Sequence, residues 1–305
     1  MNIDFNHALV ALDQSDASDI IINCLGHFRQ FGTQKFTLFT SVSIPYPGGL
    51  GTGDGSRYKE NLDGYRKKLE PLGIEVQTVT RLKINAYAPV EILEAAREHH
   101  ADYIIIANRG YNKYLEFLLG STATEVLQRC SLPVYLINIS VSDEPDLKSR
   151  TLFCARSCRD SLQHILYPTD FSPISERALG VVKKLAAGNT QKVTLLHVQA
   201  SGRPGVDDPE TLKKFDETDT SRLNRLKADL LKVTDAGVDV KIGYGSPVRN
   251  ILVYADDNDA TMIIMGSQGR GYISDLFLGG VCQQVIRNAG IPVLTVPAER
   301  KADKQ

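Results

Sequence analysis

The chain has 305 residues, of which 42% are hydrophobic and 23% charged, and its formal net charge is -1. At about twice the typical domain length of roughly 150 residues, it is expected to form two domains with separate cores. The composition excludes a disordered chain, and the lack of a basic excess disfavours a nucleic-acid-binding protein.

The first half alternates short apolar runs with longer segments of helical period, a pattern typical of βαβ units and a parallel sheet. Residues 90–99 place their apolar side chains on one helical face, and residues 121–129 follow Gly120 as a short helix. The expected strands lie near residues 7–12, 35–42, 74–80, 103–107 and 134–139.

A glycine-rich run from Gly48 to Gly55 follows the second of these strands. It lacks the Lys-Ser/Thr ending and the strand-to-helix context of a P-loop. We therefore interpret it as a flexible loop, placed where it could cover a site in the first half.

Residues 141–161 are polar and charged, include Pro145 and show little periodicity. These features indicate a linker with one short strand near residues 151–154. The second half then repeats the first, and its runs of Val, Ile and Leu are typical of strands buried on both faces. Its expected strands lie near residues 164–168, 192–199, 238–242, 261–266 and 293–296.

The fold class expected is therefore α/β, with two tandem open-sheet domains that each hold a five-stranded parallel sheet flanked by helices. The first domain is predicted to span residues 1–140 and the second residues 162–298, with a polar tail at residues 299–305.

Both halves carry the same landmarks in the same order. Asp13 and Asp170 each end the first strand of their half. Gly110 precedes Gly120 by ten positions, and a second pair, Gly269 and Gly279, has the same spacing after the fourth strand of the second half. This agreement indicates that one domain has been duplicated.

The landmarks fall where an open parallel sheet binds ligands, outside the carboxyl ends of its strands. Glycines there let backbone N–H groups approach an anion, and the following helix N-terminus adds a partial positive charge. A phosphate group is the predicted ligand.

These residues resemble the universal stress proteins, specifically the tandem kind with two domains in one chain. Nucleotide-binding members of that family carry the pattern G-x2-G-x9-G-[S/T] after the fourth strand and an aspartate at the end of the first. The second half matches at Gly266, Gly269 and Gly279, but Gly280 stands where Ser or Thr is expected. The first half matches at Gly110, Gly120 and Ser121, but Ala107 replaces the leading glycine.

The resemblance implies an adenine nucleotide, ATP or AMP, with Mg²⁺ accompanying ATP. Asp13, Asp170, Val42 and Val198 would face adenine, and the glycines would line the ribose and phosphates. In the first half, Ser121 and Thr122 would add hydroxyl donors. We favour the second half as the binding site, with the first half weaker or degenerate.

Plainer interpretations remain open for the same residues. The two aspartates could cap the helices that follow them, the glycines could serve tight turns, and the pair Ser121 and Thr122 could be an ordinary cap. His197 is expected to be a core histidine, and Cys24, Cys130 and Cys282 are expected to be core or near-core residues.

Cys154 and Cys158 have His164 nearby, but we expect no metal site there. Zinc normally takes four ligands and usually a shorter Cys spacing. We also see no paired carboxylate, triad or metal cluster placed for catalysis.

The function expected is a nucleotide-binding module in a stress response. One rival is a slow ATPase or nucleotidyl transferase, although the loops after Asp13 and Asp170 lack the glycines of S-G-G-x-D-S. A second rival is a scaffold that has lost nucleotide binding, which the departures at Ala107 and Gly280 motivate.

Assembly and location are also predicted. The family resemblance implies association through the last strands, residues 133–139 and 292–296, within the chain or in a homodimer. No apolar run reaches the roughly 18 residues of a membrane span, no signal peptide is seen, and five scattered cysteines fit a reducing compartment, so a cytoplasmic protein is expected.

Overall fold

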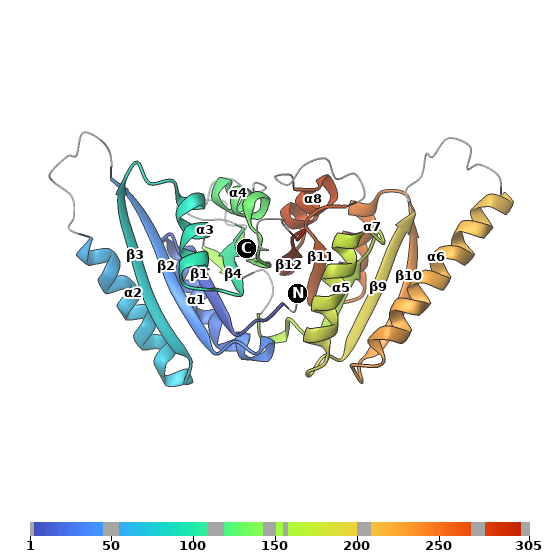
Figure 1. Cartoon of the computed structure of the whole chain (residues 1–305), viewed down its shortest axis with the longest axis horizontal. Coiled ribbons are helices and arrows are strands. Elements are labelled where there is room, and N and C mark those ends of the chain that lie inside the picture. Colours follow the sequence, from blue (N-terminus) through green and yellow to red (C-terminus); the bar gives the residue numbers. More distant parts are fainter. Residues whose placement is uncertain are drawn as a thin grey trace. The chain divides into compact units, whose positions relative to one another are not determined.

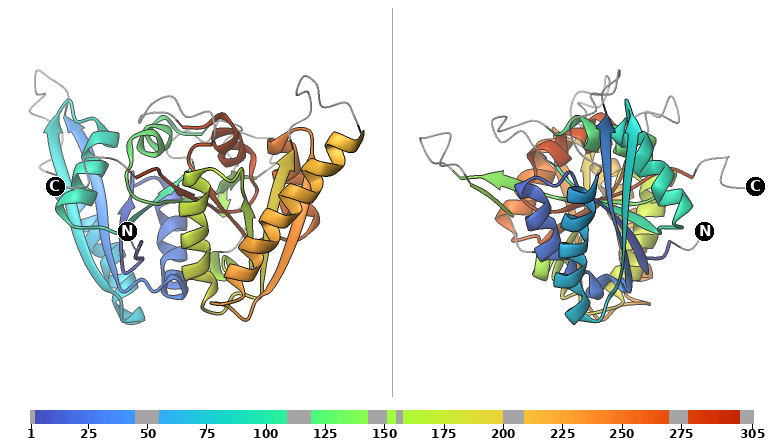
Figure 2. Two further views of the ribbon diagram at one scale, coloured as in Figure 1. Left: turned by 45° about the vertical axis from the view of Figure 1, so that its right-hand side comes forward. Right: turned by 90° about the vertical axis from the view of Figure 1, so that its left-hand side faces the viewer.

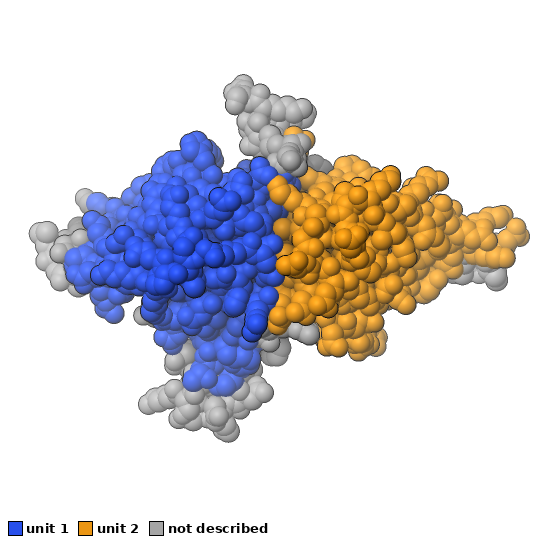
Figure 3. All heavy atoms as spheres, turned by 90° about the horizontal axis from the view of Figure 1, so that it is seen from below, with its two compact units in different colours: residues 1–159 blue, residues 160–305 orange. Residues whose placement is uncertain are grey.

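The structure is a computed structural model. It describes residues 3–44, 55–108, 119–142, 151–154, 158–199, 209–269 and 278–299. The chain divides into two compact units, residues 1–159 and residues 160–305 (Figure 3). Each unit is an α/β domain whose main sheet has five parallel strands, as the sequence predicts.

Unit 1 has the strand order β3-β2-β1-β4-β5, and every neighbouring pair in that order is parallel (Figure 1). Its five sheet strands are β1 (His7–Ala11), β2 (Lys35–Ile44), β3 (Glu75–Ile84), β4 (Tyr103–Ala107) and β5 (Val134–Ile137). Its helices are α1 (Asp16–Leu25), η1 (Gly26–Phe31), α2 (Ser56–Leu69), η2 (Glu70–Leu72), α3 (Ala88–Glu98) and α4 (Ser121–Arg129).

Unit 2 repeats this order as β10-β9-β8-β11-β12, again with all neighbours parallel. Its strands are β8 (His164–Pro168), β9 (Lys192–Gln199), β10 (Gly237–Tyr244), β11 (Met262–Gly266) and β12 (Val293–Val296). Its helices are α5 (Pro173–Ala186), α6 (Pro209–Leu230), α7 (Pro247–Asp257) and α8 (Gly280–Asn288).

Helices cover both faces of each sheet because right-handed crossovers change face when the strand order reverses. In unit 1, α2 packs against β2 and β3, whereas α3 packs against β1, β2 and α4 (Figure 2). In unit 2, α5 packs against β8 and β11, and α7 packs against β9, β10 and α8. None of the helices in the described ranges is both long and apolar enough to cross a membrane.

The central strands carry the core of each unit. Every residue of β4 and of β11 is buried, which agrees with their continuous apolar sequence. In β3 no residue is fully buried, and the strand extends to Ile84, beyond the predicted end at residue 80. β3 lies at the edge of the sheet, so its side chains need not be apolar. Its polar residues therefore continue the backbone hydrogen bonding with β2 beyond residue 80.

The segment predicted to link the halves contributes structure to unit 1. Its strand β7 (Leu152–Cys154) pairs antiparallel with β6 (Ile139–Val141), with Ile139 opposite Cys154. Strand β7 also packs against α1, and the short helix η3 (Cys158–Asp160) follows. The expected strand near residues 151–154 is present.

The first strand of each unit begins with a histidine in a repeated network. His7 Nε2 lies 2.8 Å from Thr37 Oγ1, and His164 Nε2 lies 2.9 Å from Thr194 Oγ1. His164 Nδ1 lies 3.0 Å from the Asn258 carbonyl oxygen, so it donates and Nε2 accepts. Burial lowers the pKa of both imidazoles.

This network makes stability depend on pH. Because the folded-state pKa of His164 lies below its unfolded value of about 6.5, the unfolded chain binds more protons, and stability falls as pH drops through that value. We expect His164→Gln to lose less free energy of unfolding than the wild type between about pH 7.5 and about pH 5. Denaturant titrations at both pH values measure the difference, and an equal loss in both proteins would contradict the assignment.

Candidate functional site

A cavity of about 330 Å³ lies at the carboxyl ends of β8, β9 and β11 in unit 2. Its walls also include the first turns of α7 and α8. The lining residues are Pro168, Thr169, Asp170, Ser175, Leu196, Val198, Pro247, Ile251, Met265, Gly266, Gln268, Gly269, Gly279, Gly280, Val281 and Cys282.

The cavity follows from the strand topology. β8 and β11 are neighbours, and their register pairs Met262 with Ile165 and Ile263 with Leu166. Beyond this point β8 leads into α5 and β11 leads toward α8, and α5 and α8 belong to opposite faces of the sheet. A crevice therefore opens at the point where the strand order reverses.

All six second-half residues that the sequence singles out line this one cavity. They are Asp170, Val198, Gly266, Gly269, Gly279 and Gly280. Sequence reasoning missed the wall that α7 provides through Pro247 and Ile251. A proline at the first helical position after the third strand was the only local signal for that wall.

The turn after β8 holds Asp170 against the glycine loop. Phe171 adopts a left-handed backbone with φ of 58°, and the Ser172 N–H donates to Asp170 Oδ1 at 3.0 Å. The other carboxylate oxygen, Oδ2, lies 2.8 Å from the position that a Cβ on Gly269 would take. A side chain at position 269 would therefore require this carboxylate to move.

The helix-capping interpretation of the two aspartates is wrong. The N-cap residues are Ser15 for α1 and Ser172 for α5, and their hydroxyl oxygens accept the N–H of Ala17 and Ser175. The aspartates lie two positions earlier and instead accept N–H bonds from these serines. The local turn requires a side-chain acceptor at the aspartate, and the serine does the capping.

Gly279, at the start of α8, lets the helix pack closely against the backbone of Ser267 and Gln268. A Cβ on Gly279 would lie 3.2 Å from Gln268 Cα and 3.3 Å from the Ser267 carbonyl oxygen. Gly279 is the N-cap of α8, and no described side chain caps the helix there. The N–H groups of the first turn, which normally need an acceptor, therefore face the cavity end of the helix.

His197 is a buried core histidine, which confirms the sequence prediction. It contacts the turn that carries Asp170. Its Nδ1 donates to the Thr169 carbonyl oxygen at 2.7 Å, and its ring centroid lies 4.5 Å from that of Phe171. On its other side, Nε2 lies 3.4 Å from Asp219 Oδ2. These contacts position the residue before and the residue after Asp170.

The first half differs from the second at the cavity-lining position that Val198 occupies in β9. The sheet register pairs His7 with Lys35 and His164 with Lys192, so Ser41 occupies the position of Val198. Val42 was the predicted counterpart, but it lies one residue further along. Since successive side chains of a strand point to opposite faces, Val42 is directed away from the face that Val198 uses.

In the first half a partly buried ion-pair cluster lies beside the position of Ser41. Arg81 is in register with Ser41, as Gly243 is with Val198. Its Nη1 lies 3.2 Å from Glu91 Oε2, on the helix equivalent to α7, and its guanidinium lies 5.7 Å from the centre of the Phe39 ring. Although burial opposes ionisation of Glu91, hydrogen bonds from Lys83 and Arg81 lower its pKa.

The alanine that replaces the leading glycine of the motif is accommodated within the protein. A Cβ on Gly266 would lie 2.8 Å from Ile174 Cγ2, in the first turn of α5. In the first half, Ala17 stands in place of Ile174, two residues after the serine cap, which leaves room for the methyl group of Ala107. The departure at Ala107 is therefore paired with a smaller neighbour on the helix.

The remaining first-half residues are only partly described. Gly110 and residues 48–54 of the predicted loop over residues 48–55 lie outside the described residues, and Gly55 is the N-cap of α2. Asp13 Oδ1 accepts from the Ser15 hydroxyl at 2.6 Å and from the Ser15 N–H at 3.0 Å. α4 begins at Ser121 after Gly120 as N-cap, with no side-chain capping bond among the described residues, so Ser121 and Thr122 do not cap it.

The model of the universal stress protein family matches the chain twice, at residues 4–138 and 161–297. The chain belongs to the universal stress protein family. The two matches make it a tandem member, with one family domain in each unit.

Relatives that match one half of the chain and relatives that match nearly all of it agree with this assignment. The chain is 33% identical over 153 residues to universal stress protein MJ0577 of Methanocaldococcus jannaschii, covering 43% of this chain and 93% of the relative. It is 22% identical over 300 residues to universal stress protein Rv2623 of Mycobacterium tuberculosis, covering 94% of each. The crystal structure of a universal stress protein from Archaeoglobus fulgidus has the same fold, with a TM-score of 0.65, 24% identity and 97% coverage of each chain.

The exchange of Gly266 and Ile174 for alanines can be tested directly. Gly266→Ala should lower the free energy of unfolding by about 1–3 kcal/mol, because the new methyl group overpacks against Ile174. In an Ile174→Ala background the same change should cost less. Denaturant unfolding of the four proteins of this cycle gives the coupling, and equal penalties in both backgrounds would contradict the compensation.

Proposed function

We propose that the chain binds an adenine nucleotide, ATP or AMP, in the cavity of unit 2 and serves as a regulatory module in a stress response. The observation that carries the proposal is the convergence of all six second-half motif residues around one cavity. The volume of about 330 Å³ falls in the range of roughly 300–1,000 Å³ common for small-molecule sites.

The apolar part of the cavity suits a planar base. Leu196 and Val198 from β9 and Ile251 from α7 contribute apolar side chains to the lining. The Asp170 carboxylate in the same lining can accept a hydrogen bond from an N–H donor on the ring system. Adenine offers such a donor in its exocyclic amino group.

The opposite part suits phosphates. The first turn of α8 presents backbone N–H groups that no described side chain caps, and the helix dipole places partial positive charge at the same end. Gly269 and Gly279 have no side chain, so a phosphate group could approach the backbone there. Mg²⁺ would accompany ATP through the phosphate oxygens.

Unit 2 is the favoured site because Ser41 stands in unit 1 where the apolar Val198 lines the cavity of unit 2. On the neighbouring strand, Arg81, paired with Glu91, stands where unit 2 has Gly243. Glu91 is buried and Arg81 partly buried, so breaking this pair would leave a poorly solvated carboxylate without its partner. Occupancy of unit 1 is proposed to be weaker.

Association through the last strands is a further part of the proposal. β5 and β12 each lie at the end of their own unit's five-strand order, as the family mode of association requires. Sedimentation velocity would establish whether such pairing involves a second chain.

Substitution of Gly269 should weaken binding in the favoured half. Gly269→Val places a branched side chain in the cavity lining and forces the Asp170 carboxylate to move, so we expect saturable ATP binding to weaken by at least about 10-fold, or about 1.4 kcal/mol. Isothermal titration of the full chain with ATP and Mg²⁺ measures the affinity.

Two controls make this titration decisive. Gly180→Val lies on an exposed turn of α5, where a Cβ meets no other atom, and should bind like the wild type. Asp13→Ala, the equivalent change to Asp170→Ala, should leave the stronger site intact. Wild-type-like affinity in Gly269→Val and Asp170→Ala would refute the site.

A substitution at position 280 is expected to strengthen ATP binding. A Cβ on Gly280 would meet no atom within 4 Å, so Gly280→Ser should fold normally and restore the hydroxyl of the family pattern. One added hydrogen bond of about 0.5–1.5 kcal/mol should tighten ATP binding roughly 2- to 10-fold. Weaker binding than the wild type in the same titration would mean that the phosphates lie elsewhere.

A further inference from the structure

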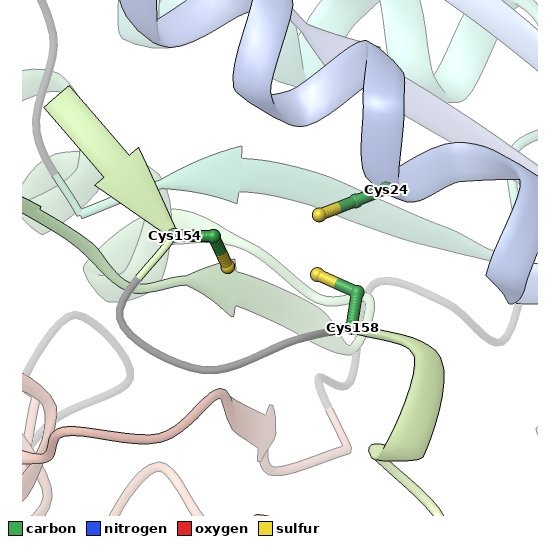
Figure 4. Close-up of side chains that lie close together, drawn as sticks. All are labelled: Cys24, Cys154 and Cys158. Atoms are coloured by element: carbon green, nitrogen blue, oxygen red, sulfur yellow. The ribbon is translucent and has the colours of Figure 1, made fainter.

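Three cysteines from separate segments of the sequence meet in unit 1 (Figure 4). Cys24 lies in the last turn of α1, Cys154 ends β7 and Cys158 begins η3. Their sulfur atoms all lie within 4.8 Å of one another, and none of the three cysteines forms a disulfide. Figure 4 shows the three side chains directed toward a common point between them.

The sequence predicts no metal site at Cys154 and Cys158, and the nearby His164 is not part of this cluster. Both ring nitrogens of His164 are engaged by Thr194 and by the Asn258 carbonyl. The third thiol comes instead from Cys24, far away in the sequence and predicted only as a core residue. It is buried, as predicted, with 7% of its surface exposed.

Backbone contacts hold each cysteine in place. The pairing of β7 with β6 sets Cys154 opposite Ile139, and β7 packs against α1, which carries Cys24. Gln30 Nε2 donates to the Cys158 carbonyl oxygen at 3.1 Å, which ties this residue to η1. The three thiols are thus brought together by the fold.

We propose that Cys24, Cys154 and Cys158 form a site for a soft d10 metal ion of the Zn²⁺ or Cu(I) class. Thiolate ligands select such ions over Mg²⁺ or Ca²⁺. Thiolates that bind one ion at about 2.3 Å lie roughly 3.8–4.0 Å apart, so a small contraction of the cluster suffices. Each thiol gives up its proton to solvent when it binds, and no oxidant or reductant is needed.

Burial distinguishes this role from a disulfide switch. Cys158 is 2% exposed and Cys24 is buried, whereas Cys154 is partly exposed and marks the route from solvent. A disulfide would join two sulfurs at about 2.05 Å and leave the third without a role. Three convergent thiols, two of them shielded from solvent, favour ion binding.

A bound ion would fasten the segment after the first domain onto α1. Residues 151–154 and 158–159 reach unit 1 through the β6–β7 pairing and the Gln30 contact. Because the ion binds only the folded arrangement, it should raise the stability of unit 1. This effect is independent of nucleotide binding in unit 2.

The test uses the full chain, reduced and freed of metal, with Cd²⁺ as the probe. We expect one Cd²⁺ per chain, a thiolate-to-metal charge-transfer band in the ultraviolet, and a rise in melting temperature; Zn²⁺ should compete for the site and Mg²⁺ should not. Cys24→Ser, Cys154→Ser and Cys158→Ser should each weaken binding by at least about 100-fold.

Cys130→Ser is the matched control, since Cys130 is a buried cysteine of the same unit outside the cluster. It should bind Cd²⁺ like the wild type. Circular dichroism checks that each variant is folded, and Cys154→Ser, at the least buried position, keeps the test valid if the other two unfold. The proposal is overturned if the reduced wild type binds no Cd²⁺, if folded Cys154→Ser binds it normally, or if Cys130→Ser loses it as well.

Discussion

The reversal of strand order beside β8 is the constraint on which the site depends. Right-handed crossovers send α5 and α8 to opposite faces of the sheet, so the ends of β8 and β11 must separate. Such a gap is filled by side chains, by ordered water or by a ligand. In unit 2 glycines occupy positions 269 and 279 of the cavity lining, so these positions contribute no side chain to fill it.

The two halves share the backbone geometry of this arrangement but differ in the side chains around it. Both halves retain the aspartate, the left-handed residue after it and the serine cap, because the turn geometry requires all three. The exchanged residues come in matched groups: Ala107 occurs with Ala17 where Gly266 occurs with Ile174, and Arg81 occurs with Glu91 where Gly243 occurs with Asn250. Such groups preserve packing while they alter which side chains lie near the end of each sheet.

Sequence reasoning reached the features that depend on local pattern. Continuous apolar runs predicted the buried strands, and the spacing of aspartate and glycines predicted which second-half residues meet at the cavity. It misjudged features set by contacts distant in sequence. Val42 was aligned by residue type, whereas the register of β2 places Ser41 at the position of Val198. The length of the edge strand β3 and the approach of Cys24 to Cys154 and Cys158 arise from tertiary packing, which no local pattern encodes. For the α7 wall the sequence offers only Pro247 as a local signal.

Photoaffinity labelling with an azido-adenine nucleotide tests the central claim most directly, because it reports where the base lies. The account predicts labelled peptides from the cavity wall of unit 2, at β9 or the first turn of α7, that disappear when excess ATP competes. Labelling that ATP suppresses only in unit 1, or labelling that ATP suppresses nowhere, would contradict the assignment of the crevice beside β8 as the nucleotide site.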